Sequence, residues 1–310
     1  MRSVRVASIS FMGAGRASTP RETIERNLNA LIRLMEKAYA DEPDIICLPE
    51  CSPMLGLSIE EMVKAAEEVP GRIFNEVASK AKDYGVYVIC PMIEKKEGYV
   101  YNSAILIDRG GEYVGSYHKM YPTIGEMNAG IRPGTEPKTF TVDFGKIGVA
   151  ICFDLNFEDV IKGMADDGAE LIFFPSMYPG GLQLKMWAFK YAIYFVSAIT
   201  GEGSVVVDPL GRILATSSVY SPVICKTINL DYKIIHIDYH YEKMDSIKRK
   251  YGAKVEIEVS RPEGIFLLTS NLKDLSVNDL INEFQLDTRE EYFQKSARIR
   301  AEILRKASTT

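Results

Sequence analysis

The sequence predicts one large α/β sandwich domain followed by a C-terminal extension. Three observations support this fold class. Strands and helices alternate through the first half of the chain, four strand-like runs cluster between residues 194 and 229, and the pattern changes after Asp231. Such a mixture indicates sheets with both parallel and antiparallel neighbours, covered by helices on their outer faces. We therefore expect the domain at residues 1–230 and the extension at 231–310.

Composition agrees with a globular protein and narrows the function classes. The chain has 310 residues, of which 46% are hydrophobic and 25% charged, and its formal net charge is −5. These values exclude a mainly disordered chain, and the mild acidity gives no electrostatic reason to expect a nucleic-acid partner. Apolar runs fall short of the roughly 18 residues of a transmembrane helix, so no membrane association is expected. The five cysteines are odd in number and form no CxxC, which favours a reducing, cytoplasmic location.

The first elements carry clear end signals. Residues 2–11 alternate like a strand. Thr19, Pro20 and Glu22 then supply an N-cap, a proline at the first helical position and a capping-box glutamate for a helix that continues past Met35. The next expected elements are a strand at 44–48, a short helix capped by Ser58 and Glu61, a helix at 72–84 ended by Gly85, and a strand at 86–93.

The middle of the chain continues this pattern with a hairpin. Residues 99–107 and 112–117 flank turn residues Asp-Arg-Gly-Gly, which is typical of two antiparallel strands. The expected elements after the hairpin are a strand at 146–151, a helix at 157–167, a strand at 170–174, a helix at 182–193, and strands at 194–199, 204–208, 212–216 and 223–229.

The residues after Asp231 form too short a segment for a confident independent core. We expect a charged helix at 242–251, a strand at 264–270 and a final helix from Thr288 to about Lys306. A segment of this size typically packs on its own domain or on a partner subunit. The sequence therefore favours a homo-oligomer.

Cys152 is the first candidate for chemistry. An apolar strand runs into this cysteine, and a helix begins a few residues later. Such a turn exposes a thiol beside backbone N–H groups and the positive end of a helix, which can lower a thiol pKa and bind an oxyanion. The alternative is that Cys152 is a small buried hydrophobe, the commonest fate of a free cysteine.

A nucleophilic cysteine needs a base, and the histidines are poorly suited. The chain has three histidines, His118, His236 and His240. None of them has an orienting partner nearby in the sequence. Two charged residues are better placed. Glu50 follows Pro49 at the end of a buried strand, and Lys119 follows the second hairpin strand. Taken singly, either could be an ordinary surface charge at a strand end.

Taken together and in this order, these three sites resemble the nitrilase superfamily of carbon-nitrogen hydrolases. The resemblance covers roughly residues 4–230 and places its Glu-Lys-Cys triad on Glu50, Lys119 and Cys152. It also includes the supporting segments at 102–104, 132–134, 168–171 and 207–212. It implies a four-layer α-β-β-α sandwich with mixed sheets that assembles as a homodimer or a larger homo-oligomer.

The resemblance also suggests roles for the site residues. Glu50 would be the general base, Cys152 the nucleophile, and Lys119 with the backbone N–H of Phe153 the oxyanion donors. Glu126 matches a second family glutamate that would hold Lys119 and position the substrate, whereas Glu136 is expected to be solvated. This chemistry requires neither a metal nor an organic cofactor. His236 and His240 have helical i,i+4 metal-ligand spacing but lie in a strand-like or loop segment, which argues against a metal site.

The residues after the cysteine favour one branch of the superfamily. Nitrile-cleaving members typically carry Cys-Trp-Glu, whereas this chain has Cys-Phe-Asp at 152–154. We therefore expect hydrolysis of a small linear amide through a cysteine thioester, with release of ammonia or an amine. The alternatives are an N-carbamoyl amine or amino-acid hydrolase, then a nitrilase, and, in another class, a non-catalytic scaffold that keeps the fold.

Overall fold

The computed structural model describes residues 1–308, which divide into two compact units. The sandwich unit is Val4–Ile228. The C-terminal unit consists of Met1–Ser3 together with the residues from Asn229 onward. Each unit is described by itself below.

The first sheet of the sandwich unit has six strands in the order β12-β1-β2-β3-β4-β5. Its central strands β1, β2 and β3 are parallel, whereas β3, β4 and β5 run antiparallel to one another. The strand bounds are β1 Ser3–Ile9, β2 Ile45–Cys47, β3 Tyr87–Lys96, β4 Tyr99–Ile107, β5 Tyr113–His118 and β12 Val223–Asn229.

The second sheet repeats this plan in the order β11-β10-β9-β8-β7-β6. Strands β7, β8 and β9 are parallel, and the outer pairs are antiparallel. The strand bounds are β6 Thr139–Val142, β7 Gly145–Val149, β8 Leu171–Ser176, β9 Tyr194–Ile199, β10 Val205–Val207 and β11 Ile213–Thr216. The Ser8 hydroxyl donates across to the Ser197 carbonyl oxygen at 2.5 Å, so the two sheets lie face to face.

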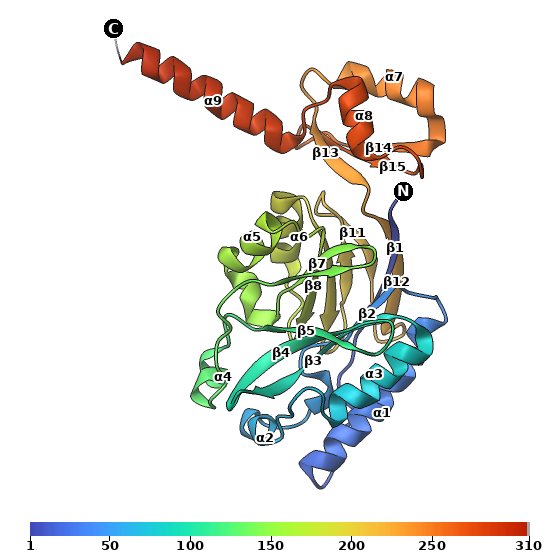
Figure 1. Cartoon of the computed structure of the whole chain (residues 1–310), viewed down its shortest axis with the longest axis vertical. Helices are drawn as coiled ribbons and strands as arrows, with labels where there is room; N and C mark the ends of the chain where they lie inside the picture. The colour runs from blue at the N-terminus through green and yellow to red at the C-terminus, as the bar shows by residue number, and fades with distance from the viewer. Residues whose placement is uncertain (309–310) are drawn as a thin grey trace. The chain divides into compact units, whose positions relative to one another are not determined.

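Helices cover the outer faces of both sheets, which completes four layers (Figure 1). Helices α1 (Pro20–Tyr39) and α3 (Arg72–Tyr84) lie on the first sheet, and α5 (Glu158–Asp166) and α6 (Gly181–Tyr191) lie on the second. Shorter elements are η1 (Ser52–Met54), α2 (Ile59–Lys64), α4 (Ile124–Asn128) and η2 (Cys152–Asn156). The expected mixed-sheet sandwich is therefore confirmed.

Local sequence signals explain where these helices begin and end. Thr19 and Ser58 each form a capping box with a glutamate three residues later, as the sequence predicts. Gly85 ends α3 with φ +63, a left-handed conformation that glycine adopts at little cost. Ile24, Leu28 and Leu31 lie on the buried face of α1, which packs against the sheet.

The C-terminal unit has a small core of its own. Strands β13 (Tyr232–His236), β15 (Ile265–Ser270) and β14 (Val255–Ser260) form an antiparallel sheet in that order. Helices α7 (Tyr241–Tyr251), α8 (Val277–Phe284) and α9 (Arg289–Ala307) complete the unit, with the short η3 (Gly252–Lys254). Its core consists of Ile235, Ile247, Val255, Phe266, Leu268, Val277, Leu280 and Leu286.

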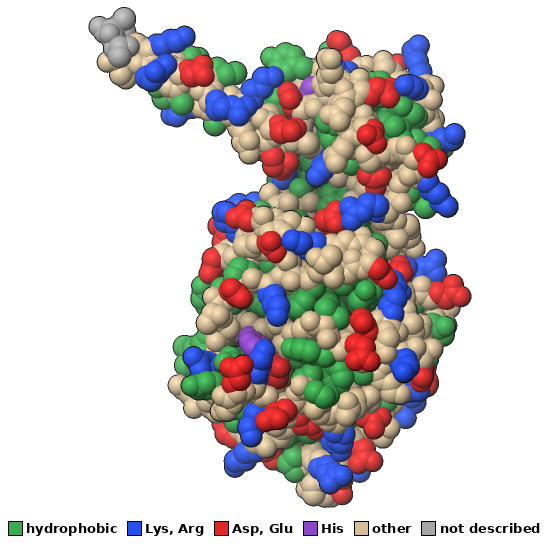
Figure 2. Space-filling model, in the orientation of Figure 1, with side chains coloured by type: hydrophobic (Ala, Val, Ile, Leu, Met, Phe, Trp, Pro, Cys, Tyr) green, Lys and Arg blue, Asp and Glu red, His purple; other side chains and the backbone are tan. Residues whose placement is uncertain are grey.

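Helix α9 differs from α1 and α3 because it keeps branched apolar side chains in solvent. Ile299 is 50% exposed and Ile303 is 61% exposed. Figure 2 shows hydrophobic and basic side chains side by side along this helix. No helix among residues 1–308 is long and apolar enough to span a bilayer.

Candidate active site

Glu50 sits just beyond β2, where the chain leaves the first sheet. The preceding Pro49 cannot donate a ladder hydrogen bond, and the following Cys51 adopts φ +47, so the strand ends sharply here. The Glu50 side chain is buried. Its carboxylate accepts hydrogen bonds from Lys119 Nζ at 2.8 Å and from the backbone N–H of Met177 at 3.1 Å. A buried carboxylate is thus held in one orientation by donors from two different strand ends.

Lys119 follows β5, and its backbone is fixed on both sides. Its N–H donates to the Asn102 carbonyl oxygen at 2.9 Å, and its carbonyl oxygen accepts from Gly134 N–H at 2.8 Å. The side chain is 1% exposed. Burial alone would lower the pKa of this ammonium group, but the carboxylates of Glu50 and Glu126 outweigh burial and raise the pKa well above its ordinary value. Lys119 therefore stays positively charged.

Glu126 lies in the short helix α4 and contacts the same ammonium. Its two carboxylate oxygens are 3.1 and 2.9 Å from Lys119 Nζ. The same carboxylate caps its helix by accepting from Thr123 N–H at 2.6 Å. Burial would raise the pKa of Glu126, but the Lys119 charge outweighs it and the pKa is lowered. The capping box thus aims this glutamate at the lysine.

Asn102 is a site residue that sequence reasoning quoted only as part of a supporting segment. It lies on β4, and its Nδ2 group donates to Glu50 Oε1 at 2.9 Å and to Glu126 Oε1 at 2.7 Å. The hint in the residues themselves is a polar Asn-Ser pair within a largely apolar strand. Asn102 and Lys119 together place donors between two buried carboxylates, which offsets the repulsion of the two negative charges.

Cys152 ends the extended chain after β7 and opens η2, with φ +50. A non-glycine residue in this left-handed conformation marks a tight turn of the kind expected at this position. Burial, followed by the nearby Glu50 charge, raises the pKa of the thiol to about 12, although Lys119 and the Met177 N–H oppose this. The expected lowering of the thiol pKa is therefore wrong, and the resting group is a protonated thiol.

Asp154 holds the turn that presents the cysteine. Its fully buried carboxylate accepts from Tyr117 Oη at 2.8 Å and from the N–H groups of Ile151 at 2.9 Å and Tyr121 at 2.8 Å. Burial raises the pKa of Asp154 to about 6, and these three donors limit the rise. Phe153, between the two residues, has a half-exposed ring that packs edge-on against Phe157 at 5.4 Å between centroids.

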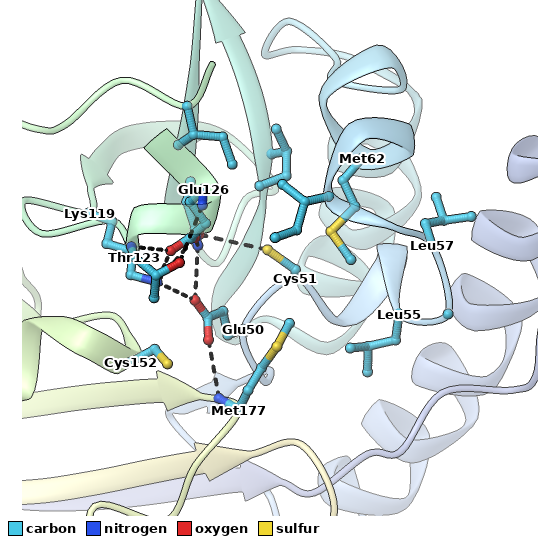
Figure 3. A pocket seen from close by; sticks show the side chains of 15 residues that line it. Glu50, Cys51, Leu55, Leu57, Met62, Lys119, Thr123, Glu126, Cys152 and Met177 are labelled. Carbon is cyan, nitrogen blue, oxygen red and sulfur yellow. Dashed lines mark hydrogen bonds and ion pairs between the residues drawn. The ribbon is translucent and has the colours of Figure 1, made fainter. Parts of the chain in front are cut away.

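One cavity of about 340 Å³ brings these groups together, and Figure 3 shows them converging on Glu50. Its polar side carries Glu50, Lys119 and Cys152, with Asn102 and Glu126 behind them. The apolar side chains of Leu55, Leu57 and Met62 lie beyond Cys51 in the picture. The hydrophobic wall of the cavity consists of these three residues together with Ile59, Ile93 and Ile131. The cavity is therefore a reactive polar face opposite a hydrophobic wall.

A family model described as carbon-nitrogen hydrolase matches residues 7–233. The chain belongs to the carbon-nitrogen hydrolase family. The match spans almost the whole sandwich unit, so the residues that line the cavity and nearly all of the two large sheets lie within it. This carbon-nitrogen hydrolase is an enzyme of the nitrilase superfamily, as the sequence predicts.

Curated relatives of this carbon-nitrogen hydrolase include two amidases. The chain is 25% identical over 234 residues to omega-amidase NIT2 of Xenopus tropicalis, which covers 66% of this chain and 84% of that protein. It is 31% identical over 183 residues to N-carbamoylputrescine amidase of Solanum lycopersicum, which covers 56% of this chain and 59% of that protein.

Solved structures share the fold of this carbon-nitrogen hydrolase. Nit3 of Saccharomyces cerevisiae, a nitrilase-superfamily member, superposes with a TM-score of 0.65 at 20% identity, covering 81% of this chain and 95% of that chain. An amidase from Nesterenkonia sp. gives a TM-score of 0.62 at 20% identity, covering 80% of this chain and 96% of that chain. At this identity these likenesses establish the fold.

The remaining candidates of the hydrolase lie outside the cavity lining. Glu136 is exposed, as expected. His236 stacks on Tyr292 at 3.8 Å between centroids, and His240 Nε2 accepts from Asp287 N–H at 2.9 Å. The two histidines therefore sit at the end of β13 and the start of α7, each in contact with the region before or within α9. Within residues 1–308, no group of three or more histidine, cysteine or acidic side chains is arranged to hold a metal ion.

Proposed function

We propose that this carbon-nitrogen hydrolase cleaves the carbon–nitrogen bond of a small linear amide through a thioester on Cys152. The observation that carries the proposal is the shared cavity, in which Cys152 faces a buried carboxylate and a buried ammonium group. Amide cleavage needs a base, an oxyanion donor and a nucleophile, and in this proposal those roles fall to Glu50, Lys119 and Cys152 in that order. The similarity to two curated amidases supports the same reaction class.

The first half of the reaction forms the thioester. As the Cys152 sulfur attacks the substrate carbonyl carbon, its proton passes to Glu50, so a thiol with a pKa of about 12 need not ionise beforehand. The carbonyl oxygen becomes an oxyanion that Lys119 and the Phe153 N–H stabilise. When the intermediate collapses, the carbon–nitrogen bond breaks and Glu50 returns the proton to the departing nitrogen. Ammonia or an amine leaves.

The second half of the reaction releases the acid. Glu50 accepts a proton from a water molecule that attacks the thioester carbon, and the same donors hold the second oxyanion. The carbon–sulfur bond then breaks, and the sulfur recovers a proton from Glu50. Glu126 and Asn102 act as positioning residues because they hold Lys119 and Glu50 through bonds of 2.7–3.1 Å. They fix the distance between base and oxyanion donor.

A second candidate is an N-carbamoyl amine hydrolase. The 31% identity to N-carbamoylputrescine amidase favours it, and the same residues would attack a carbamoyl carbon. A nitrilase is a weaker candidate, because Phe-Asp follows Cys152 where nitrile-cleaving members of the superfamily typically carry Trp-Glu.

Ammonia release from matched amides, carbamoyl compounds and nitriles tests the reaction class. We expect kcat/KM to be higher for each amide than for the corresponding nitrile, and Cys152→Ala to lose turnover while it keeps the wild-type melting temperature. Cys225→Ala is the matched control, because Cys225 is also partly exposed but lies outside the cavity lining. Full activity of Cys152→Ala, or a preference for nitriles, would reject the mechanism.

A further inference from the structure

The hydrophobic wall of the cavity is the feature that the reaction itself does not use. It consists of six aliphatic side chains from the segment 55–62, the end of β3 and the loop after α4. The charged side chains that line the cavity are Glu50, Glu126 and Lys119. Figure 3 shows them across Cys51 from Leu55, Leu57 and Met62. The wall offers methyl and methylene groups but no hydrogen-bond donor from a side chain.

The cation of the cavity lining is already engaged. Lys119 Nζ lies within 3.1 Å of three carboxylate oxygens, two from Glu126 and one from Glu50. Two carboxylates against one ammonium leave the lining with an excess of negative charge. A substrate with its own carboxylate would bury that charge against the wall without a partner, which is costly in a low-dielectric environment.

Building on the proposed function, we infer that the enzyme selects amides whose acyl group is an uncharged aliphatic chain. The wall would receive the chain attached to the carbonyl carbon. The nitrogen of the amide must face Glu50, which returns a proton to it, so its N–H groups meet carboxylate acceptors. An alkyl group on that nitrogen would replace an N–H with carbon beside these carboxylates. The aliphatic chain therefore belongs on the acyl side.

Three six-carbon amides separate the possibilities. Hexanamide carries an aliphatic acyl chain, the monoamide of adipic acid carries the same chain ending in a carboxylate, and N-butylacetamide carries its chain on nitrogen. We expect kcat/KM to rise about fourfold for each methylene added between acetamide and butyramide. We expect hexanamide to exceed the adipic monoamide by at least about a hundredfold, and to exceed N-butylacetamide as well. A preference for the adipic monoamide or for N-butylacetamide would overturn the inference.

Substitutions in α2 test the wall itself. Ile59 is half-buried and lines the cavity, whereas its neighbour Glu60 is exposed and lies outside the lining. Ile59→Lys should lower the ratio of hexanamide to adipic monoamide turnover at least tenfold, Ile59→Met should keep the ratio, and Glu60→Lys should leave it unchanged. Melting temperatures confirm that each variant is folded. An unchanged ratio in folded Ile59→Lys would show that the acyl chain does not reach this wall.

Binding distinguishes this inference from the reaction on which it rests. Calorimetry with the Cys152→Ala protein measures affinity for hexanamide and for the adipic monoamide without turnover. Tighter binding of hexanamide, together with no hydrolysis of any amide by the wild-type protein, would reject the proposed function and keep the wall's preference. Hydrolysis of acetamide with no rise in kcat/KM for longer acyl chains would keep the proposed function and reject the wall's preference.

Discussion

Two ion pairs, one from each unit of the chain, lie in opposite surroundings. In the sandwich unit, Lys119 and Glu50 pair at 2.8 Å with side chains that are 1% and 3% exposed. In the C-terminal unit, Arg249 and Asp245 pair at 3.3 Å with side chains that are 83% and 82% exposed. Water screens the second pair and not the first, so only the first can control the protonation of its neighbours.

Helices from the two units also differ in how they place their apolar side chains. Helices α1 and α3 bury their apolar faces against a sheet, whereas α9 leaves Ile299 and Ile303 in solvent. The comparison leads to the hypothesis that the sandwich unit carries the chemistry and that α9 contributes to association. The following predictions test this division.

The largest effect should come from matched lysine substitutions. Lys119→Met removes the oxyanion charge and leaves two buried carboxylates unpaired, so we expect a loss of kcat/KM of at least about a hundredfold and a lower melting temperature. Lys250→Met breaks a largely exposed pair with Glu283 and should change neither quantity measurably. Steady-state kinetics and thermal unfolding provide both readouts. Similar effects from the two substitutions would break the comparison between buried and exposed charges.

Substitutions in α9 should affect turnover less but should lower the mass of the assembly in solution. The first turn of the helix carries Glu290 and Glu291 and its last turn carries Arg305 and Lys306, so an antiparallel copy would set acidic side chains against basic ones. We predict a homo-oligomer in which α9 packs on α9 of a second copy through Ile299 and its neighbours. Light scattering should show the Ile299→Glu, Ile303→Glu double variant at a lower mass than the wild-type protein, with Glu302→Gln as control.

Two outcomes would contradict that assembly. One is a wild-type protein that is monomeric at micromolar concentration. The other is a double variant that keeps the wild-type mass. Turnover per chain should persist in the double variant, because the cavity is lined by residues of the sandwich unit.

The smallest expected effect is a pH dependence of stability from Asp154. Its pKa rises from 3.8 to about 6 on folding, so the native state binds this proton more tightly than the unfolded chain does. The resulting stability is fully present below pH 3.8 and is lost as the pH rises through about 6. Asn at this position cannot titrate. The free energy of unfolding of the wild-type protein, relative to Asp154→Asn, should therefore fall by up to about 3 kcal/mol between pH 4 and pH 7.

Denaturant unfolding of both proteins at several pH values measures this difference. Comparison with the variant cancels the other carboxylates, whose titration the two proteins share. Parallel curves for the wild-type and Asp154→Asn proteins would show that Asp154 keeps its ordinary pKa in the fold.

Elements with strong local signals could be predicted from the sequence. The capping boxes at Thr19 and Ser58 and the stop at Gly85 depend on residues within one turn, and the structure confirms all three. The short elements β6 and α4, and β14 and α8 in the C-terminal unit, were not predicted. The two strands are short, and tertiary packing contributes more to them than local propensity does. Helices α4 and α8 do begin with capping boxes, which the sequence analysis did not use.

The candidate site divides in the same way. Glu50, Lys119 and Cys152 each follow a strand, which is why the sequence singled them out, and the structure places all three around one cavity. Asn102 had no such signal, since its role depends on a carboxylate 52 residues away. The contact of Met177 with Glu50 is made by a backbone N–H, so the residue type at position 177 does not predict it. The prediction of a lowered thiol pKa is wrong because burial and the Glu50 carboxylate raise this pKa more than Lys119 and the Met177 N–H lower it.

The protonated state of Cys152 has a consequence for survival under oxidative conditions. Peroxides attack the thiolate, and further oxidation to sulfinic or sulfonic acid is irreversible for most proteins. A thiol whose pKa is about 12 presents little thiolate at neutral pH. In the proposed mechanism Glu50, which adds to the effect of burial on this pKa, accepts the proton once a substrate carbonyl group is in place. On that mechanism, Cys152 would react with a bound amide while reacting little with peroxide.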